Sequence, residues 1–200
     1  MERKFFWVGT AILLVLVIAV GAAYLTRDRS YRGVRYNPPK EAYDFTLESA
    51  DGAQVHLHDF RGKLALIFFG FTHCDEICPT TLAILKQVKA SLGSQASQVQ
   101  VIYITVDPLR DTPQVIQENA SAFDPSFIGL SGSEEALQPV WEAYGVFREL
   151  PADANSMGHY EVTHSTRLYL IDAQGRLFLS FDYGTPPADI LHDVRLVLGK

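Results

Sequence analysis

The sequence predicts an α/β protein whose central mixed sheet is flanked by helices. Apolar runs of strand length alternate along the chain with segments whose apolar residues recur at helical spacing. A pair of alternating apolar and polar segments precedes this pattern, and a second such pair follows it near the C-terminus. Strands that alternate with helices and end in an antiparallel pair indicate a mixed sheet. The 200 residues leave room for one such domain and an appendage.

The predicted domain, residues 41–200, begins with a β-hairpin. Residues 44–48 and 54–58 alternate apolar and polar side chains, and Ala50-Asp51-Gly52 between them is a turn signal. His56 and His58 would share one face of the second strand, either as a metal-binding pair or, as we prefer, as part of a solvated face.

A central α/β pattern follows the hairpin. Leu64–Phe69 is wholly apolar, which is typical of a strand that is buried on both faces. Thr112 and Ser133 are candidate helix caps, and Gly93 is a helix stop. The remaining elements are predicted in this order: a helix ending near Leu92, a strand at 99–106, a helix at 113–123, a strand at 127–130, a helix ending at Tyr144, a loop at 148–163, strands at 167–172 and 177–183, and a last helix capped by Thr185.

The only two cysteines, Cys74 and Cys78, follow the central apolar strand at the start of its helix. A dithiol in this place is the thioredoxin-like arrangement, and positions i and i+4 share one face of a helix. The pair can cycle between dithiol and disulfide or hold a soft metal ion such as Cu(I) or Zn(II) as two thiolates. Polar neighbours such as His73 and Glu76 argue against two structural core cysteines.

Two sulfurs are an incomplete metal site, so a third ligand is expected from elsewhere in the chain. The sequence has six histidines, of which His73 is adjacent to Cys74 but would not face it on a helix. His164 directly precedes the predicted strand at 167–172, where thioredoxins carry a cis-proline beside the dithiol. No proline lies between Pro151 and Pro186. We therefore predict His164 as the third ligand.

The first 40 residues differ in character from the rest of the chain. Phe5–Leu25 is a run of 21 residues without a charge, long enough to span a bilayer as a helix. It exceeds the apolar core of a cleaved signal peptide, for which Gly21-Ala22-Ala23 would be the cleavage site. We expect an uncleaved membrane anchor at 1–25 and a linker at 26–40. Arginines on both sides of the span leave its orientation open.

Charge is also divided unevenly. Residues 1–40 hold seven Lys or Arg and two Asp or Glu, whereas residues 41–200 hold ten and twenty-one. A domain this acidic lacks the basic face that nucleic acids require, so we expect no nucleic-acid partner.

Four motifs resemble one known family, the Sco/SenC copper proteins. They are G-F-T-H-C-D-E-I-C-P-T-T-L, I-T-V-D-P-L-R-D-T-P, Y-G-V and V-T-H-S-T-R-L-Y-L-I-D, in this order behind one N-terminal span. The resemblance covers residues 41–200 and implies a thioredoxin-like fold that binds one copper, as Cu(I) or Cu(II), through Cys74, Cys78 and His164. It also implies a role near the site for Asp107, although a strand-end aspartate before a proline turn explains that residue equally well.

The resemblance further implies a function, a location and partners. The chain would be a copper metallochaperone rather than an enzyme, anchored by one span in the inner membrane with its domain in the periplasm. It would deliver copper to the CuA site of cytochrome c oxidase subunit II and meet other copper-handling proteins. The alternative is a thiol–disulfide oxidoreductase in which Cys74 and Cys78 reduce partner cysteines before metal insertion.

Overall fold

The computed structural model describes residues 15, 17, 30–151 and 160–199. The chain divides into two compact units, Met1–Ser30 and Tyr31–Lys200. Of the predicted span Phe5–Leu25, only Val15 and Val17 are described, both as helix, and the rest of that prediction lies outside the described residues. Among the residues that are described, no helix has the length and apolar character needed to cross a membrane.

The second unit is built on a six-stranded mixed sheet with the strand order β1-β10-β9-β4-β5-β6. The central strand, β4, is buried along its whole length and pairs parallel with β5 and antiparallel with β9, which confirms the prediction for this apolar run. The strands of this sheet are β1 (Val34–Glu41), β4 (Leu64–Gly70), β5 (Val99–Thr105), β6 (Ile128–Leu130), β9 (Leu168–Ile171) and β10 (Arg176–Phe181).

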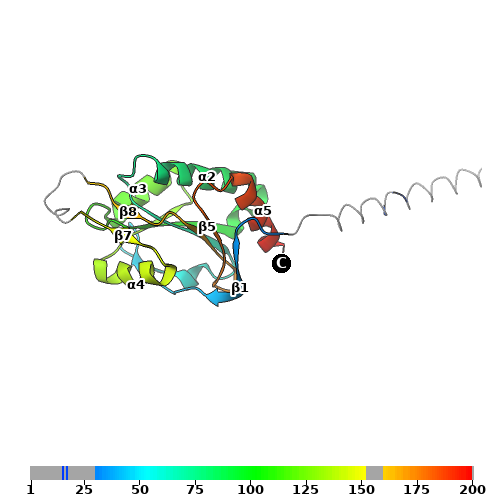
Figure 1. Ribbon diagram of the computed structural model, residues 1–200, viewed down its shortest axis with the longest axis horizontal. Helices are drawn as coiled ribbons and strands as arrows, with labels where there is room; N and C mark the ends of the chain where they lie inside the picture. The colour runs from blue at the N-terminus through cyan, green and yellow to red at the C-terminus, as the bar shows by residue number, and fades with distance from the viewer. Residues whose placement is uncertain (1–14, 16, 18–29, 152–159, 200) are drawn as a thin grey trace, which may run out of the picture. The chain divides into compact units, whose positions relative to one another are not determined.

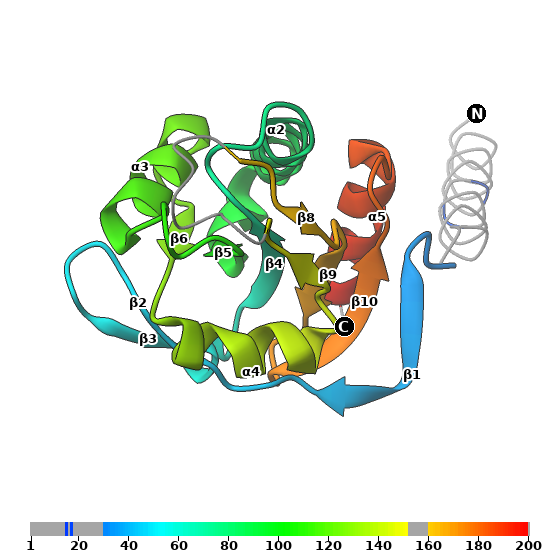
Figure 2. The same ribbon diagram turned by 60° about the vertical axis from the view of Figure 1, so that its left-hand side comes forward.

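Helices cover both faces of the sheet, as predicted. On one face lie α2 (Ile77–Ser91), α3 (Pro113–Phe123) and α5 (Pro187–Leu198), and on the other lies α4 (Glu134–Tyr144) (Figure 1). The predicted hairpin is confirmed as β2 (Thr46–Glu48) and β3 (Gln54–His56), a separate two-stranded sheet near α4 (Figure 2). The short 3-10 helices η1 (Leu57–Phe60) and η2 (Gly93–Gln98) complete the connections.

Local capping decides where the helices begin. The hydroxyls of Thr112 and Ser133 accept backbone N–H groups in the first turns of α3 and α4, as predicted. The predicted cap of the last helix is wrong, because Pro186 occupies the cap position and the Thr185 hydroxyl donates to the carbonyl of Asp182. Proline at the cap and at the first helical position sets the start of α5 without a side-chain hydrogen bond.

The predicted linker at 26–40 requires a correction, because the sheet already begins at Val34. Strand β1 pairs antiparallel with β10 at the edge of the sheet, with a register shift between Arg35 and Lys40. Pro38 and Pro39, which suggested a linker, lie within this shift. Proline is tolerated there because an edge strand with a bulge leaves some backbone groups outside the hydrogen-bond ladder. The folded unit therefore starts before residue 41.

A buried carboxylate holds the start of this strand against the last helix. Asp193 of α5 is fully buried and accepts hydrogen bonds from the backbone N–H groups of Arg32 and Gly33 at 2.8 to 3.0 Å. These contacts join two segments that are about 160 residues apart in sequence. Residues 32–33 thus belong to the folded unit and not to a free stem.

We predict that Asp193→Ala lowers the free energy of unfolding by about 1–3 kcal/mol, because two backbone donors lose their acceptor. Chemical denaturation of the full chain measures this, with Glu118→Ala as the control, since Glu118 is an exposed acid on α3. Equal stability of the Asp193 and Glu118 variants would show that the contact does not hold β1.

Candidate metal centre

The two cysteines lie where the central strand gives way to its helix. Strand β4 ends at Gly70 and α2 begins at Ile77, so Cys74 lies in the connecting loop and Cys78 in the first turn of the helix. Both are free thiols. Cys74 is half-buried, whereas Cys78 is 2% exposed and belongs to the hydrophobic core. Only Cys78 is helical, so the two cysteines do not share one face of a helix as the sequence had suggested.

The Cys74 sulfur lies at the N-terminus of α2. The backbone N–H of Cys78 donates to Cys74 Sγ at 3.3 Å, and the cap residue, Glu76, makes no side-chain cap hydrogen bond. The first N–H groups of a helix have no partner within the helix and favour negative charge. Cys74 therefore occupies the position that a capping side chain would take, and its thiolate is favoured there.

The pKa values of the two thiols are shifted in opposite directions. A hydrogen bond from the Cys78 thiol, helped by backbone N–H groups and opposed by burial, lowers the pKa of Cys74 to about 6. The same hydrogen bond, followed by burial, raises the pKa of Cys78. In the metal-free dithiol at neutral pH, the half-buried Cys74 is a thiolate. The buried Cys78, which we call the deep thiol, is protonated and donates to it.

His164 approaches the deep sulfur from the other side of the site. It lies on β8 (Thr163–His164), which pairs antiparallel with β7 (Arg148–Glu149) inside the predicted loop. His164 Nδ1 contacts the carbonyl of Ser165 at 2.7 Å, so Nδ1 is the donor and Nε2 carries the free lone pair. Nε2 lies 4.0 Å from Cys78 Sγ. Burial lowers the pKa of His164, so the ring is neutral at pH 7.

The structure thus places Cys78 next to Cys74 on one side and His164 on the other. A sulfur and a nitrogen that share one ion, with bonds of about 2.3 and 2.0 Å, lie roughly 3.6–3.8 Å apart, close to the observed Cys78–His164 separation. Across the described residues, however, no group of three or more His, Cys, Asp or Glu side chains is already spaced to hold a metal ion. The donor set, two sulfurs and one neutral imidazole, suits a soft ion such as Cu(I).

Asp111 positions the loop that carries Cys74, a role that the sequence did not reveal. Its buried carboxylate accepts hydrogen bonds from the N–H and hydroxyl of Thr72, at 3.0 and 2.5 Å, and from the hydroxyl of Thr105 at 2.8 Å. Thr72 is two residues before Cys74, and Thr105 ends β5. An aspartate just before a helix is usually exposed, so the sequence pattern gives no sign of this role.

Asp107 lies in a buried cluster beside the site. Its carboxylate accepts from Arg110 Nε and, at 2.7 Å, from the Tyr160 hydroxyl. The Arg110 guanidinium stacks on the Tyr160 ring at 3.6 Å and reaches Phe71, whose ring lies edge-on to His164. These contacts support both roles expected for Asp107, because it lies just beyond the end of β5 and also organises the wall next to His164.

The other histidines that the structure describes form no comparable site. The rings of His56 and His58 stack at 4.8 Å, but Thr46 contacts the first and Asp44 the second, at 2.9 and 2.6 Å. This agrees with the preferred solvated face, since both rings have polar partners within the hairpin region. His73 is exposed and contacts its neighbour Thr72, His192 lies half-buried on α5, and His159 lies outside the described residues.

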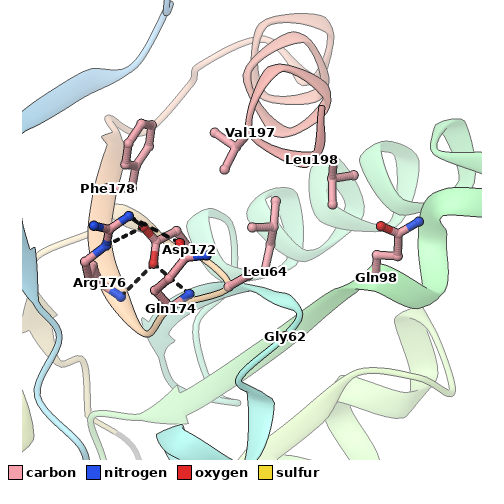
Figure 3. Close-up of a pocket in the computed structure, with 10 residues that line it drawn as sticks. Gly62, Leu64, Gln98, Asp172, Gln174, Arg176, Phe178, Val197 and Leu198 are labelled. Atoms are coloured by element: carbon pink, nitrogen blue, oxygen red, sulfur yellow. Dashed lines mark hydrogen bonds and ion pairs between the residues drawn. The ribbon is translucent and has the colours of Figure 1, made fainter. Parts of the chain in front are cut away.

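A cavity of about 420 Å³ opens at the opposite end of β4 (Figure 3). Apolar side chains such as Phe178 and Val197 line it together with Asp172 and Arg176, which pair with each other at 2.7 Å. The cavity starts at Leu64, and the seven-residue strand that runs from Leu64 to Gly70 is roughly 20 Å long. Neither cysteine lines this cavity, and no described histidine does, so the cavity is separate from the thiols.

Comparison with known proteins agrees with the fold and the site. A "SCO2-like protein" of Rickettsia felis is 34% identical over 188 residues, which cover 90% of this chain and 92% of that protein. The solution structure of apo Sco1 from Thermus thermophilus is 38% identical, with a TM-score of 0.75 over 86% of this chain and 98% of that one. The thioredoxin-like α/β fold predicted from the sequence is therefore confirmed.

Two further structures carry functional descriptions. The structure of Bradyrhizobium japonicum ScoI with copper bound is 34% identical, with a TM-score of 0.70 over 78% of this chain and 98% of that one. A second structure is that of BsSco, which is described as having a disulfide switch and as a member of the Sco family of cytochrome c oxidase assembly proteins. It is 26% identical, with a TM-score of 0.64 over 80% of this chain and 94% of that one. The SCO1/SenC family model matches residues 35–199, and the chain belongs to this family.

Proposed function

We propose that this chain is a copper metallochaperone that binds one copper through Cys74, Cys78 and His164. The observation that carries the proposal is the approach of a neutral imidazole, its Nε2 lone pair free, to within 4.0 Å of the deep thiol. Copper bound in a related Sco structure supports the choice of metal. Thiolates prefer Cu(I), and three ligands are one fewer than a structural zinc site requires.

The recipient that we propose is the CuA site of cytochrome c oxidase subunit II. The description of BsSco as a member of a family of oxidase assembly proteins supports this choice. A site with three protein ligands leaves one side open, so a thiolate or imidazole of the recipient can join before His164 or a cysteine leaves. The half-buried position of Cys74 makes this sulfur the more accessible of the two. Copper would then pass between proteins without being released into solvent.

A second candidate function, thiol–disulfide exchange, is favoured by the separated pKa values of the dithiol. The Cys74 thiolate would attack a partner disulfide and form a mixed disulfide. The Cys78 sulfur, losing its proton, would then attack Cys74, release the partner as a dithiol and leave a Cys74–Cys78 disulfide. Since that disulfide has no free thiolate, the redox state of the pair would control copper loading.

We further propose that residues 1–25 are an uncleaved anchor in the inner membrane and that the domain lies in the periplasm. The uncharged run Phe5–Leu25 supports the anchor. The resemblance to the Sco/SenC family supports the orientation.

The ligand assignment predicts distinct effects of three substitutions in the reduced full chain. Cys74→Ala and Cys78→Ala abolish tight Cu(I) binding, because one thiolate and one imidazole hold a soft ion poorly. His164→Ala weakens binding by more than the roughly tenfold to hundredfold typical of outer contacts and changes the Cu(II) absorption spectrum. Competition with a Cu(I) chelator gives the affinities.

His73→Ala is the matched control, since His73 is an exposed histidine next to Cys74 in sequence. An unchanged spectrum and affinity for His164→Ala would remove His164 from the site. Zinc bound in place of copper after exposure to both metals would overturn the function.

The lowered pKa of Cys74 predicts the pH dependence of its alkylation in the metal-free, reduced chain. Because only the thiolate reacts, the iodoacetamide rate at Cys74 rises with pH and reaches half its maximum near pH 6. In Cys78→Ala the hydrogen bond from the second thiol is lost, so the midpoint moves to higher pH. Mass spectrometry of quenched samples locates the label, and a midpoint near pH 9 in the unsubstituted chain would contradict the assignment.

The anchor predicts that the membrane-bound protein keeps residues 1–25 and that alkaline phosphatase fused to its C-terminus is active. Intact-mass measurement of protein extracted from membranes tests the first point, and the phosphatase assay tests the second. A mass that corresponds to a chain beginning near residue 24 would indicate a cleaved signal peptide. An inactive fusion would indicate the opposite orientation.

A further inference from the structure

Tyr103 of β5 carries a buried hydroxyl that makes no hydrogen bond. Other buried tyrosines in the described part of the chain have acceptors: Tyr169 donates to the Tyr144 carbonyl at 2.6 Å, and Tyr160 donates to Asp107 at 2.7 Å. The Tyr103 ring itself is well packed, since it stacks on Phe68 at 5.6 Å. A buried hydroxyl without a partner costs stability, so its presence calls for an explanation.

The position of this ring places it beside the candidate metal centre. A methyl group built on Gly70 would lie 2.7 Å from Cys78 Sγ and 3.0 Å from Cε2 of Tyr103. The sulfur and the ring therefore occupy the same small space over a residue that has no side chain. The two groups also affect each other's pKa. Burial raises the pKa of Tyr103, and the Cys78 sulfur raises it further. The Tyr103 hydroxyl in turn acts to lower the pKa of Cys78.

We infer that Tyr103 is a positioning residue for the Cys78 sulfur and donates its O–H to that sulfur in the metal-bound state. A neutral thiol accepts hydrogen bonds weakly. A metal-bound Cys78 is a thiolate, and a hydrogen bond to a charged acceptor is about twice as strong as a neutral one. The inference rests on the proposed function, because it requires copper on Cys78.

Such a hydrogen bond would tune the metal. Hydrogen bonding around a cysteine sulfur alters the redox potential of a copper–thiolate site. A donor that draws electron density toward the sulfur lone pairs weakens their donation to Cu(II), which favours Cu(I) and raises the energy of the sulfur-to-Cu(II) charge-transfer band. The sequence pattern does not single out Tyr103, because a tyrosine within an apolar strand is usually a core residue.

Tyr103→Phe in the full chain tests this inference, because phenylalanine keeps the ring and its stacking on Phe68. We expect the charge-transfer band to move to lower energy and the Cu(I) affinity to fall roughly tenfold to a hundredfold, as for the loss of other outer contacts of metal ligands. The thermal midpoint of the metal-free variant should stay the same or rise, because the substitution removes an unpartnered hydroxyl. The increase in midpoint on copper binding should become smaller.

Tyr169→Phe is the matched control on the neighbouring part of the sheet. It removes a satisfied hydrogen bond, so it should lower the metal-free midpoint and leave the absorption spectrum unchanged. A Tyr103→Phe chain with the spectrum and affinity of the unsubstituted protein would overturn the inference and leave the copper site intact. Equal losses of stability with and without copper would overturn it too, since they indicate a packing role alone. Absence of copper binding in the unsubstituted chain would overturn the proposed function and this inference together.

Discussion

The arrangement of the site depends on the buried carboxylate of Asp111. It receives three hydrogen bonds, two from Thr72 in the cysteine loop and one from Thr105 at the end of β5. Burial raises the pKa of this carboxyl group, and the donors oppose that effect. Because a buried carboxylate is tolerated only with such partners, the loop and the strand end are held in one relative position. The place of Cys74 at the N-terminus of α2 follows from that constraint.

The sheet creates the difference between the two sulfurs. β4 is buried along its length, so the chain that leaves it passes through the core before it reaches the surface. Cys78, in the first turn of α2, packs back against Gly70 and is buried, whereas Cys74 remains half-exposed in the loop. One sulfur is therefore accessible to a partner, while the other lies between a tyrosine ring and an imidazole. The same division suits both the metal transfer and the thiol exchange that we propose.

Much of this architecture could be predicted because it rests on local patterns. The apolar run at β4, the turn between β2 and β3 and the caps Thr112 and Ser133 are short-range signals, and the structure confirms each of them. Strand β1 was mistaken for a linker because its two prolines are compatible with a strand only at a sheet edge. The small sheet of β7 and β8 was missed because two-residue strands have no periodicity to detect.

The sequence by itself determined the chemical groups of the site, since a lone cysteine pair after a buried strand and a histidine before another strand can be recognised from the sequence pattern. It also determined the fold class, which follows from the alternation of strands and helices. Only the tertiary structure decided how these groups relate: that His164 Nε2 faces Cys78, that Asp111 holds the cysteine loop and that the Tyr103 hydroxyl is left without a partner. The first two relations join residues 86 and 39 positions apart, and such contacts depend on packing in three dimensions rather than on local propensity.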